Sequence, residues 1–124
     1  MTEDERLRNI QGGLSVEIPY GLRDALDINA SVVAKLLNIS TSTLERRIKS
    51  EEPLGQVASE RLDRIAQITS MAEDVLESRE EAARWLTRAH SALRDQAPIT
   101  LCDTEIGARQ VRRILSAIEW GNAA

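Results

Sequence analysis

The chain has 124 residues, of which 42% are apolar and 29% are charged, and its formal net charge is −4. That length suffices for one ordinary domain or two very small ones, and the acidic balance excludes a protein that binds nucleic acid over its whole surface. With no Phe, one Tyr and two Trp, the composition favours helices over sheets, so we predict an all-α fold.

Three features point to a cytoplasmic protein. Cys102 is the only cysteine, so no internal disulfide can form. No apolar run approaches the ~20 residues of a membrane span. The opening MTEDERLRN is too charged for a signal peptide. We therefore expect a cytoplasmic location and no membrane partner.

The N-terminal segment offers little pattern. Residues 1–12 are polar, and we expect them to be frayed, with one helical turn at most. A short helix can begin at Pro19, where the missing backbone N–H carries no penalty.

A first short helix is predicted over residues 32–37. Ser31 is a suitable N-cap, because its hydroxyl can accept a bond from the first turn. Asn38 is expected to end the helix, since asparagine tolerates a left-handed backbone better than most residues.

A second short helix is predicted over residues 43–49, where Ser42 and Glu45 would form a capping box. Two short helices across a tight turn are the layout of a helix-turn-helix. Asn38 stands where that motif most often has glycine. The residues leave one alternative open, a helical hairpin that packs only on itself.

The segment over residues 30–50 is locally basic. Its charged residues are Lys35, Glu45, Arg46, Arg47 and Lys49, which sum to +3. The remainder of the chain therefore carries −7. Hydroxyl and basic side chains at the start of a recognition helix contact phosphates and base edges. The expected DNA-binding residues are Ser40, Thr41, Ser42, Arg46, Arg47 and Lys49. Lys49 could instead only stabilise the helix through Glu45.

The middle of the chain predicts a long helix over residues 57–77 and a further helix over residues 81–89. Residues 91–98 read as a turn, and residues 98–101 as one helical turn. The long helix is expected to leave a first unit and enter a second.

The last helix is predicted to begin at Asp103 or Thr104 and to end at Gly121. One face carries an apolar stripe, which suits a core or a second copy: Val111, Ile114, Leu115 and Ile118. Another side carries Arg109, Arg112, Arg113 and Trp120. A large aromatic residue beside arginines, away from the buried stripe, is the composition of a binding surface.

No catalytic or metal-binding pattern is visible. His90 is the only histidine, and with a single cysteine it cannot form a metal site. We therefore expect no enzyme activity, no metal and no cofactor.

Three segments, in order and spacing, resemble antitoxins of the Xre/ParS/MbcA type. They are ISTSTLERRI at residues 39–48, SERLDRIAQI at residues 59–68 followed by EEAARWL, and ALRDQAPITLCDTEIGARQVRRILSAIEWG at residues 92–121. The likeness covers about residues 13–121. Trp120 stands where this family more often has Tyr, and Ala89-His90-Ser91 lacks the usual Pro-Asn.

The resemblance implies an Xre-like helix-turn-helix domain over residues 13–56, joined by the long helix to a toxin-binding domain over residues 57–124. It implies a type II antitoxin whose partner is a RES-domain toxin, an enzyme that uses NAD. The last helix and tail would block the NAD pocket, and a homodimer would repress its own operon. The expected toxin-binding residues are Arg109, Arg112, Arg113, Trp120, Gly121, Asn122, Ala123 and Ala124.

The tail suits such a pocket, because its small side chains can enter a narrow cleft and a terminal carboxylate on Ala124 would mimic an anionic cofactor. Two alternatives remain open. One is a plain helix-turn-helix transcription regulator, and the other is a toxin-binding protein whose helix-turn-helix is vestigial.

Overall fold

The computed structural model describes residues 1–123, and for Asn122 and Ala123 it describes the backbone alone. Within this range the chain forms helices, and the one β-type pairing is an isolated bridge between His90 and Gln96. The prediction of an all-α fold is confirmed. None of the helices in the described part combines the length and the hydropathy that crossing a membrane requires.

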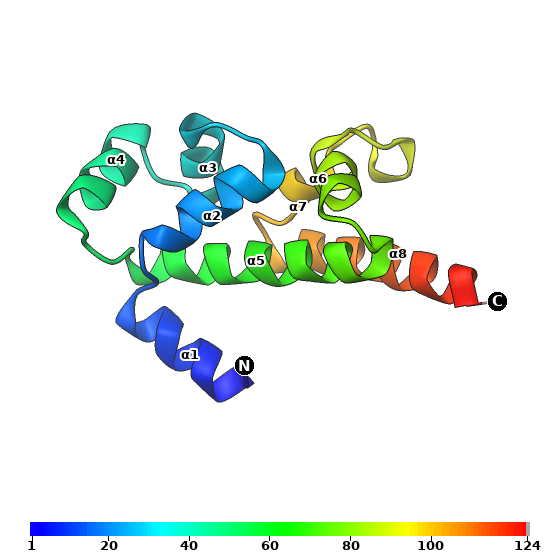
Figure 1. Ribbon diagram of the computed structural model, residues 1–124, viewed down its shortest axis with the longest axis horizontal. Helices are drawn as coiled ribbons and strands as arrows, with labels where there is room; N and C mark the ends of the chain where they lie inside the picture. The colour runs from blue at the N-terminus through cyan, green and yellow to red at the C-terminus, as the bar shows by residue number, and fades with distance from the viewer. Residues whose placement is uncertain (124) are drawn as a thin grey trace. The chain divides into compact units, whose positions relative to one another are not determined.

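The chain divides into two compact units, residues 1–63 and residues 64–124. The long helix α5 (Gln56–Leu76) contributes residues to both units (Figure 1). It begins one residue before the predicted start at Val57.

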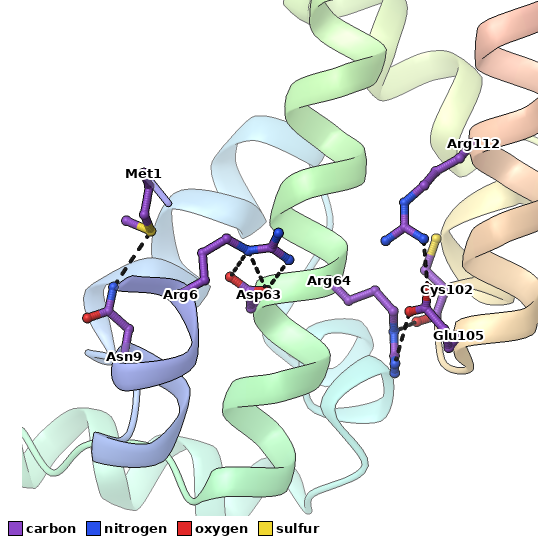
Figure 2. Close-up of polar contacts among 8 residues, drawn as sticks. All are labelled: Met1, Arg6, Asn9, Asp63, Arg64, Cys102, Glu105 and Arg112. Carbon is purple, nitrogen blue, oxygen red and sulfur yellow. Dashed lines mark hydrogen bonds and ion pairs between the residues drawn. The ribbon is translucent and has the colours of Figure 1, made fainter. Parts of the chain in front are cut away.

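The first unit opens with α1 (Glu3–Gly12), so the expectation of a frayed segment was wrong. Thr2 caps this helix by accepting a bond from the backbone N–H of Glu5 at 3.1 Å. Arg6 then binds Asp63 of α5, with Nη2 to Oδ2 at 2.7 Å and Nε to the same oxygen at 3.2 Å (Figure 2). Local pattern could not show this, because the partner lies 57 residues away.

Three short helices complete the first unit: α2 (Glu17–Leu26), α3 (Ala30–Leu37) and α4 (Thr41–Ser50). Asn38 ends α3 in the left-handed conformation, with φ 59°, as predicted. Helices α3 and α4 pack together across this turn, and Leu37 and Leu44 are fully buried between them and their neighbours. The two predicted helices of the helix-turn-helix are therefore present.

Both caps lie two residues earlier than predicted. Asn29, not Ser31, caps α3 by accepting a bond from the N–H of Val32 at 3.0 Å. Ser40, not Ser42, caps α4. Each helix is preceded by several residues that can cap, and the earlier one adds a further half turn of backbone hydrogen bonds.

The second unit holds the last part of α5 and the elements α6 (Arg79–Thr87), the 3₁₀ turn η1 (Ser91–Leu93), α7 (Pro98–Leu101) and α8 (Glu105–Ala123). The single turn predicted over residues 98–101 is α7. Helix α7 packs against both α6 and α8. Ile68, Leu86 and Leu115 are fully buried at the centre of this unit.

Helix α8 does not end at Gly121, as had been expected, but continues to Ala123. A glycine that terminates a helix adopts a positive φ. Gly121 does not, whereas Gly13 does, with φ 86°. A glycine inside a helix lowers stability by about 1 kcal/mol relative to alanine and need not break the helix.

Candidate functional site

Helix α4 exposes one polar face made of Ser42, Glu45, Arg46 and Lys49, which we call the α4 face. These side chains share a side because their spacings of three and four residues bring them round the helix together. The opposite side carries Leu44, which is buried. No described residue forms an ion pair with Arg46 or Lys49, so both cations face solvent.

The other three predicted DNA-binding residues are partly occupied within the fold. The Ser40 hydroxyl accepts a bond from the N–H of Thr43 at 3.0 Å and donates one to the Thr43 hydroxyl at 2.8 Å. Thr41 is half-buried in the first turn of α4. Arg47 is also half-buried, and its Nη1 donates a bond to the carbonyl oxygen of Pro53, which fixes the loop after α4.

Helix α8 has a buried side and an exposed side. The buried side carries Ala108, Val111 and Leu115, all with no exposed surface. Of the predicted apolar stripe, Ile114 and Ile118 lie at the margin and are half-buried. The predicted apolar face of the last helix therefore contributes Val111 and Leu115 to the core of the second unit.

The exposed side of α8 carries a line of residues that we call the α8 stripe: Ile106, Arg109, Gln110, Arg113, Ala117 and Trp120. At 100° per residue they fall within about 60° of one another's mean direction, opposite the buried side. Ile106 is 71% exposed and Trp120 is 75% exposed. Two large apolar side chains thus flank the guanidinium groups of Arg109 and Arg113 in open solvent.

Arg112, which was grouped with Arg109 and Arg113 in the sequence, lies elsewhere. It is half-buried, and its Nη1 donates to Oε1 of Glu105 at 2.8 Å. This hydrogen bond is the main reason why the pKa of the Glu105 carboxyl is lowered from its ordinary value. Arg112 therefore holds the first turn of α8 rather than extending the exposed stripe.

Arg64 of α5 fixes the turn between α7 and α8. Its side chain is buried, with Nε donating to the carbonyl oxygen of Cys102 at 2.9 Å and Nη2 to that of Asp103 at 3.1 Å. Nη1 lies 3.8 Å from Oε2 of Glu105. Figure 2 shows Arg64 and Arg112 approaching Glu105 from α5 and α8. The start of α8 is thereby set by charged hydrogen bonds.

Gly107 lets α8 begin close against α7. A Cβ atom at this position would overlap the carbonyl oxygen of Leu101. Thr104 caps the helix here, because its hydroxyl accepts a bond from the N–H of Gly107 at 3.0 Å. Of the two predicted caps, Thr104 is thus the one in use.

The predicted tail residues fall partly outside the structure's description. Gly121 is exposed in the last turns of α8. The side chains of Asn122 and Ala123, and the whole of Ala124, lie outside the described residues. Within residues 1–123 no group of three or more His, Cys, Asp or Glu side chains is placed to hold a metal ion.

Sequence reasoning did not identify Arg64 or explain Gly107. Arg64 lies between Asp63 and Ile65 on a helix with several other charged residues, so nothing in the local pattern distinguishes it from an exposed arginine. Its carbonyl partners lie 38 and 39 residues away and no local pattern reveals them.

Two family models match this chain. The antitoxin Xre-like helix-turn-helix domain matches residues 5–67. The antitoxin Xre/MbcA/ParS C-terminal toxin-binding domain matches residues 71–121, which include all of the α8 stripe.

Two curated relatives extend the comparison. A protein named antitoxin Xre, from Pseudomonas putida, is 36% identical over 83 residues, covering 67% of this chain and 52% of the relative. The chain thus spans about half the length of that relative. The Prs ADP-ribosylating antitoxin of Sphingobium sp. is 30% identical over 126 aligned positions, covering 94% of this chain and 79% of the relative.

Proposed function

The chain belongs to the antitoxin Xre family, with an Xre-like helix-turn-helix domain and an Xre/MbcA/ParS toxin-binding domain, and from this we propose that it binds and inhibits a RES-domain toxin. The binding surface is the exposed side of α8 and the residues that follow it. The observation that carries the proposal is the α8 stripe. Ile106 and Trp120 expose large apolar surfaces that the fold itself does not use.

The chemistry of the stripe suits a protein partner. Trp and Arg dominate the binding energy of protein interfaces when they lie together and become desolvated on binding. Trp120 supplies the aromatic anchor, and Arg109 and Arg113 offer charges for acidic residues on the toxin.

The proposed mode of inhibition is occlusion of an NAD pocket. The Sphingobium relative's name describes an ADP-ribosylating antitoxin, and ADP-ribosylation takes its ADP-ribose from NAD. Gly121, Asn122, Ala123 and Ala124 have little side-chain bulk, so this segment can enter a cleft shaped for a cofactor. Trp120 would then contact the rim of that cleft.

The α4 face supports a second activity, repression of the operon that encodes the protein. Arg46 and Lys49 are exposed with Ser42 on one side of a helix whose N-terminus follows a tight turn. One such helix makes few phosphate and base contacts, so a homodimer on a palindromic operator is the form we propose. Ser40 and Arg47 make hydrogen bonds within the fold and Thr41 is half-buried, so we expect these three residues to contact the DNA backbone at most.

Two other functions give different outcomes. A plain transcription regulator would bind its operator and no toxin. A toxin-binding protein with a vestigial helix-turn-helix would bind the toxin and no operator. The net charge of −4 keeps the second alternative open, because an acidic protein as a whole is repelled by DNA.

The deciding experiment is co-expression with the reading frame adjacent to this gene, which we expect to encode a RES-domain toxin, followed by co-purification and an NAD-consumption assay. We expect a stable complex in which NAD consumption is suppressed. A variant that lacks residues 122–124 should still form the complex but suppress NAD consumption less. Full suppression by that variant would contradict occlusion by the tail, and absence of any complex would contradict the antitoxin function.

A further inference from the structure

A cavity of about 500 Å³ opens in the second unit beside the α8 stripe. Its apolar lining includes Leu93 of η1, Leu101 of α7 and Ile114 of α8. Its polar lining comes from two facing segments, Arg94 and Gln96 after η1 and Gln110 and Arg113 on α8. Arg113 and Gln110 belong to the α8 stripe as well, so the cavity and the stripe form one continuous surface.

The cavity is positively charged. None of its lining residues is acidic. Arg94 and Arg113 are exposed, and no residue within 1–123 forms an ion pair with either guanidinium group. These two arginines make the cavity locally basic in a chain whose net charge is −4. The neighbouring carboxylate, Asp95, does not line the cavity.

The segment that carries Arg94 is held in one conformation. Arg94 and Asp95 both have left-handed backbones, with φ 57° and 61°, which non-glycine residues adopt at an energetic penalty. Backbone hydrogen bonds close the turn from Asp95 to His90 at 3.0 Å and from His90 to Gln96 at 3.2 Å. Leu93, which is buried, anchors it from below. The arginine is therefore presented by a stiff turn and not by a loose loop.

We propose that this cavity receives an aspartate or glutamate side chain of the toxin, an inference that rests on the proposed function. The carboxylate would accept hydrogen bonds from Arg94 and Arg113, with the amides of Gln96 and Gln110 beside it, while the aliphatic part of the side chain contacts the apolar lining. Charged hydrogen bonds of this kind strengthen when the surrounding water is excluded. Continuity with the α8 stripe makes the toxin the occupant, because a partner seated on Trp120 and Arg113 also covers this cavity.

The test measures binding of the purified toxin from the adjacent gene to variants of the full chain by isothermal titration calorimetry. Arg94→Glu should weaken binding at least about 30-fold, because it places a like charge opposite the incoming carboxylate. Arg94→Gly should also weaken binding while keeping or raising the thermal unfolding midpoint, since glycine adopts the left-handed backbone freely. The matched control is Arg88→Glu, an exposed arginine of the same unit that does not line the cavity, which should change affinity by about twofold or less.

The outcomes separate this inference from the proposed function. Wild-type affinity in both Arg94 variants, together with weakened binding by Trp120→Ala, would overturn the cavity's role and leave the antitoxin function standing. If the wild-type chain itself does not bind the toxin, the proposed function fails and the cavity proposal fails with it. Equal weakening by Arg94→Glu and Arg88→Glu would also overturn the cavity's role, because the effect would then be one of overall charge.

Discussion

The Nε atom of Arg64 donates a hydrogen bond of 2.9 Å to the backbone carbonyl oxygen of Cys102. A second bond from the same guanidinium group reaches the carbonyl of Asp103. One buried side chain thus satisfies two carbonyl groups in the turn that sets the direction of α8, and with it the α8 stripe.

Replacing Arg64 should destabilise the second unit. In Arg64→Ala the two carbonyls lose their donors inside the fold, and we expect a loss of about 2–4 kcal/mol in the free energy of unfolding. Arg64→Lys should recover only part of it, because an ammonium group cannot span two carbonyls as a planar fork does. The free energy of unfolding of the wild type and both variants can be measured by urea titration, with circular dichroism as the signal. Equal stability of the wild type and Arg64→Ala would show that water replaces the arginine without penalty.

Two glycines of α8 should respond to alanine with opposite signs. Gly107→Ala forces a methyl group onto the Leu101 carbonyl and should reduce the free energy of unfolding by about 1–3 kcal/mol. Gly121→Ala meets nothing within 4 Å and should raise it by up to about 1 kcal/mol through helix propensity. Thermal unfolding of the two single variants, each compared with the wild type, measures both effects, and each variant serves as the control for the other. A stabilised Gly107→Ala would mean that α7 and α8 are less closely packed than described.

The Cys102 thiol provides a test at high pH. Burial raises its pKa from 9.0 to about 12, against the smaller opposing effect of Arg112 and Arg64. Because the folded state holds the proton more tightly, the thiol does not change stability below the unfolded pKa. Between pH 9.0 and about 12 the unfolded chain ionises first, so this group lowers stability as pH rises. Cys102→Ala should remove that slope in urea titrations at pH 8 to 10, and an unchanged slope would assign it to other groups.

Trp120 should be an energetic centre of the toxin interface. Trp120→Ala should weaken toxin binding by about 2 kcal/mol or more, because truncated aromatic anchors lose at least that much. Its effect on unfolding should be small, since the side chain is 75% exposed. Val57→Ala, at a site 67% exposed on the first turn of α5, is the control that should leave binding unchanged. Unaltered affinity in Trp120→Ala would move the interface away from the end of α8.

A substitution at Arg46 should remove DNA binding and leave toxin binding intact. Arg46→Ala should abolish the mobility shift of DNA from the protein's own promoter, because it removes an exposed cation of the α4 face. Toxin binding should be unchanged. Arg109→Ala on the α8 stripe is the reciprocal control, expected to retain DNA binding. Operator binding that survives Arg46→Ala would exclude the α4 face as the recognition surface.

Short-range features of this fold could be predicted, and features that depend on distant partners could not. Asn38 ends α3 in the left-handed conformation, and Pro98 starts the single turn α7, because both depend on residues within one turn. Helix α1 was not predicted, and one of the contacts that hold it, from Arg6 to Asp63, joins residues 57 positions apart. The same limit applied to the surface of α8. Periodicity placed Trp120 away from the core, but it could not show that Arg112 turns toward Glu105 while Arg113 remains exposed.

The two indole rings of this chain lie in contrasting surroundings. Trp85 is half-buried, and its ring centroid lies 5.4 Å from that of His90, whereas Trp120 stands in solvent. An indole in water emits at longer wavelengths than one in an apolar environment. The intrinsic fluorescence of the unlabelled protein therefore contains a component from Trp120 that a bound partner would change. A blue shift on mixing with the toxin would report the covering of Trp120.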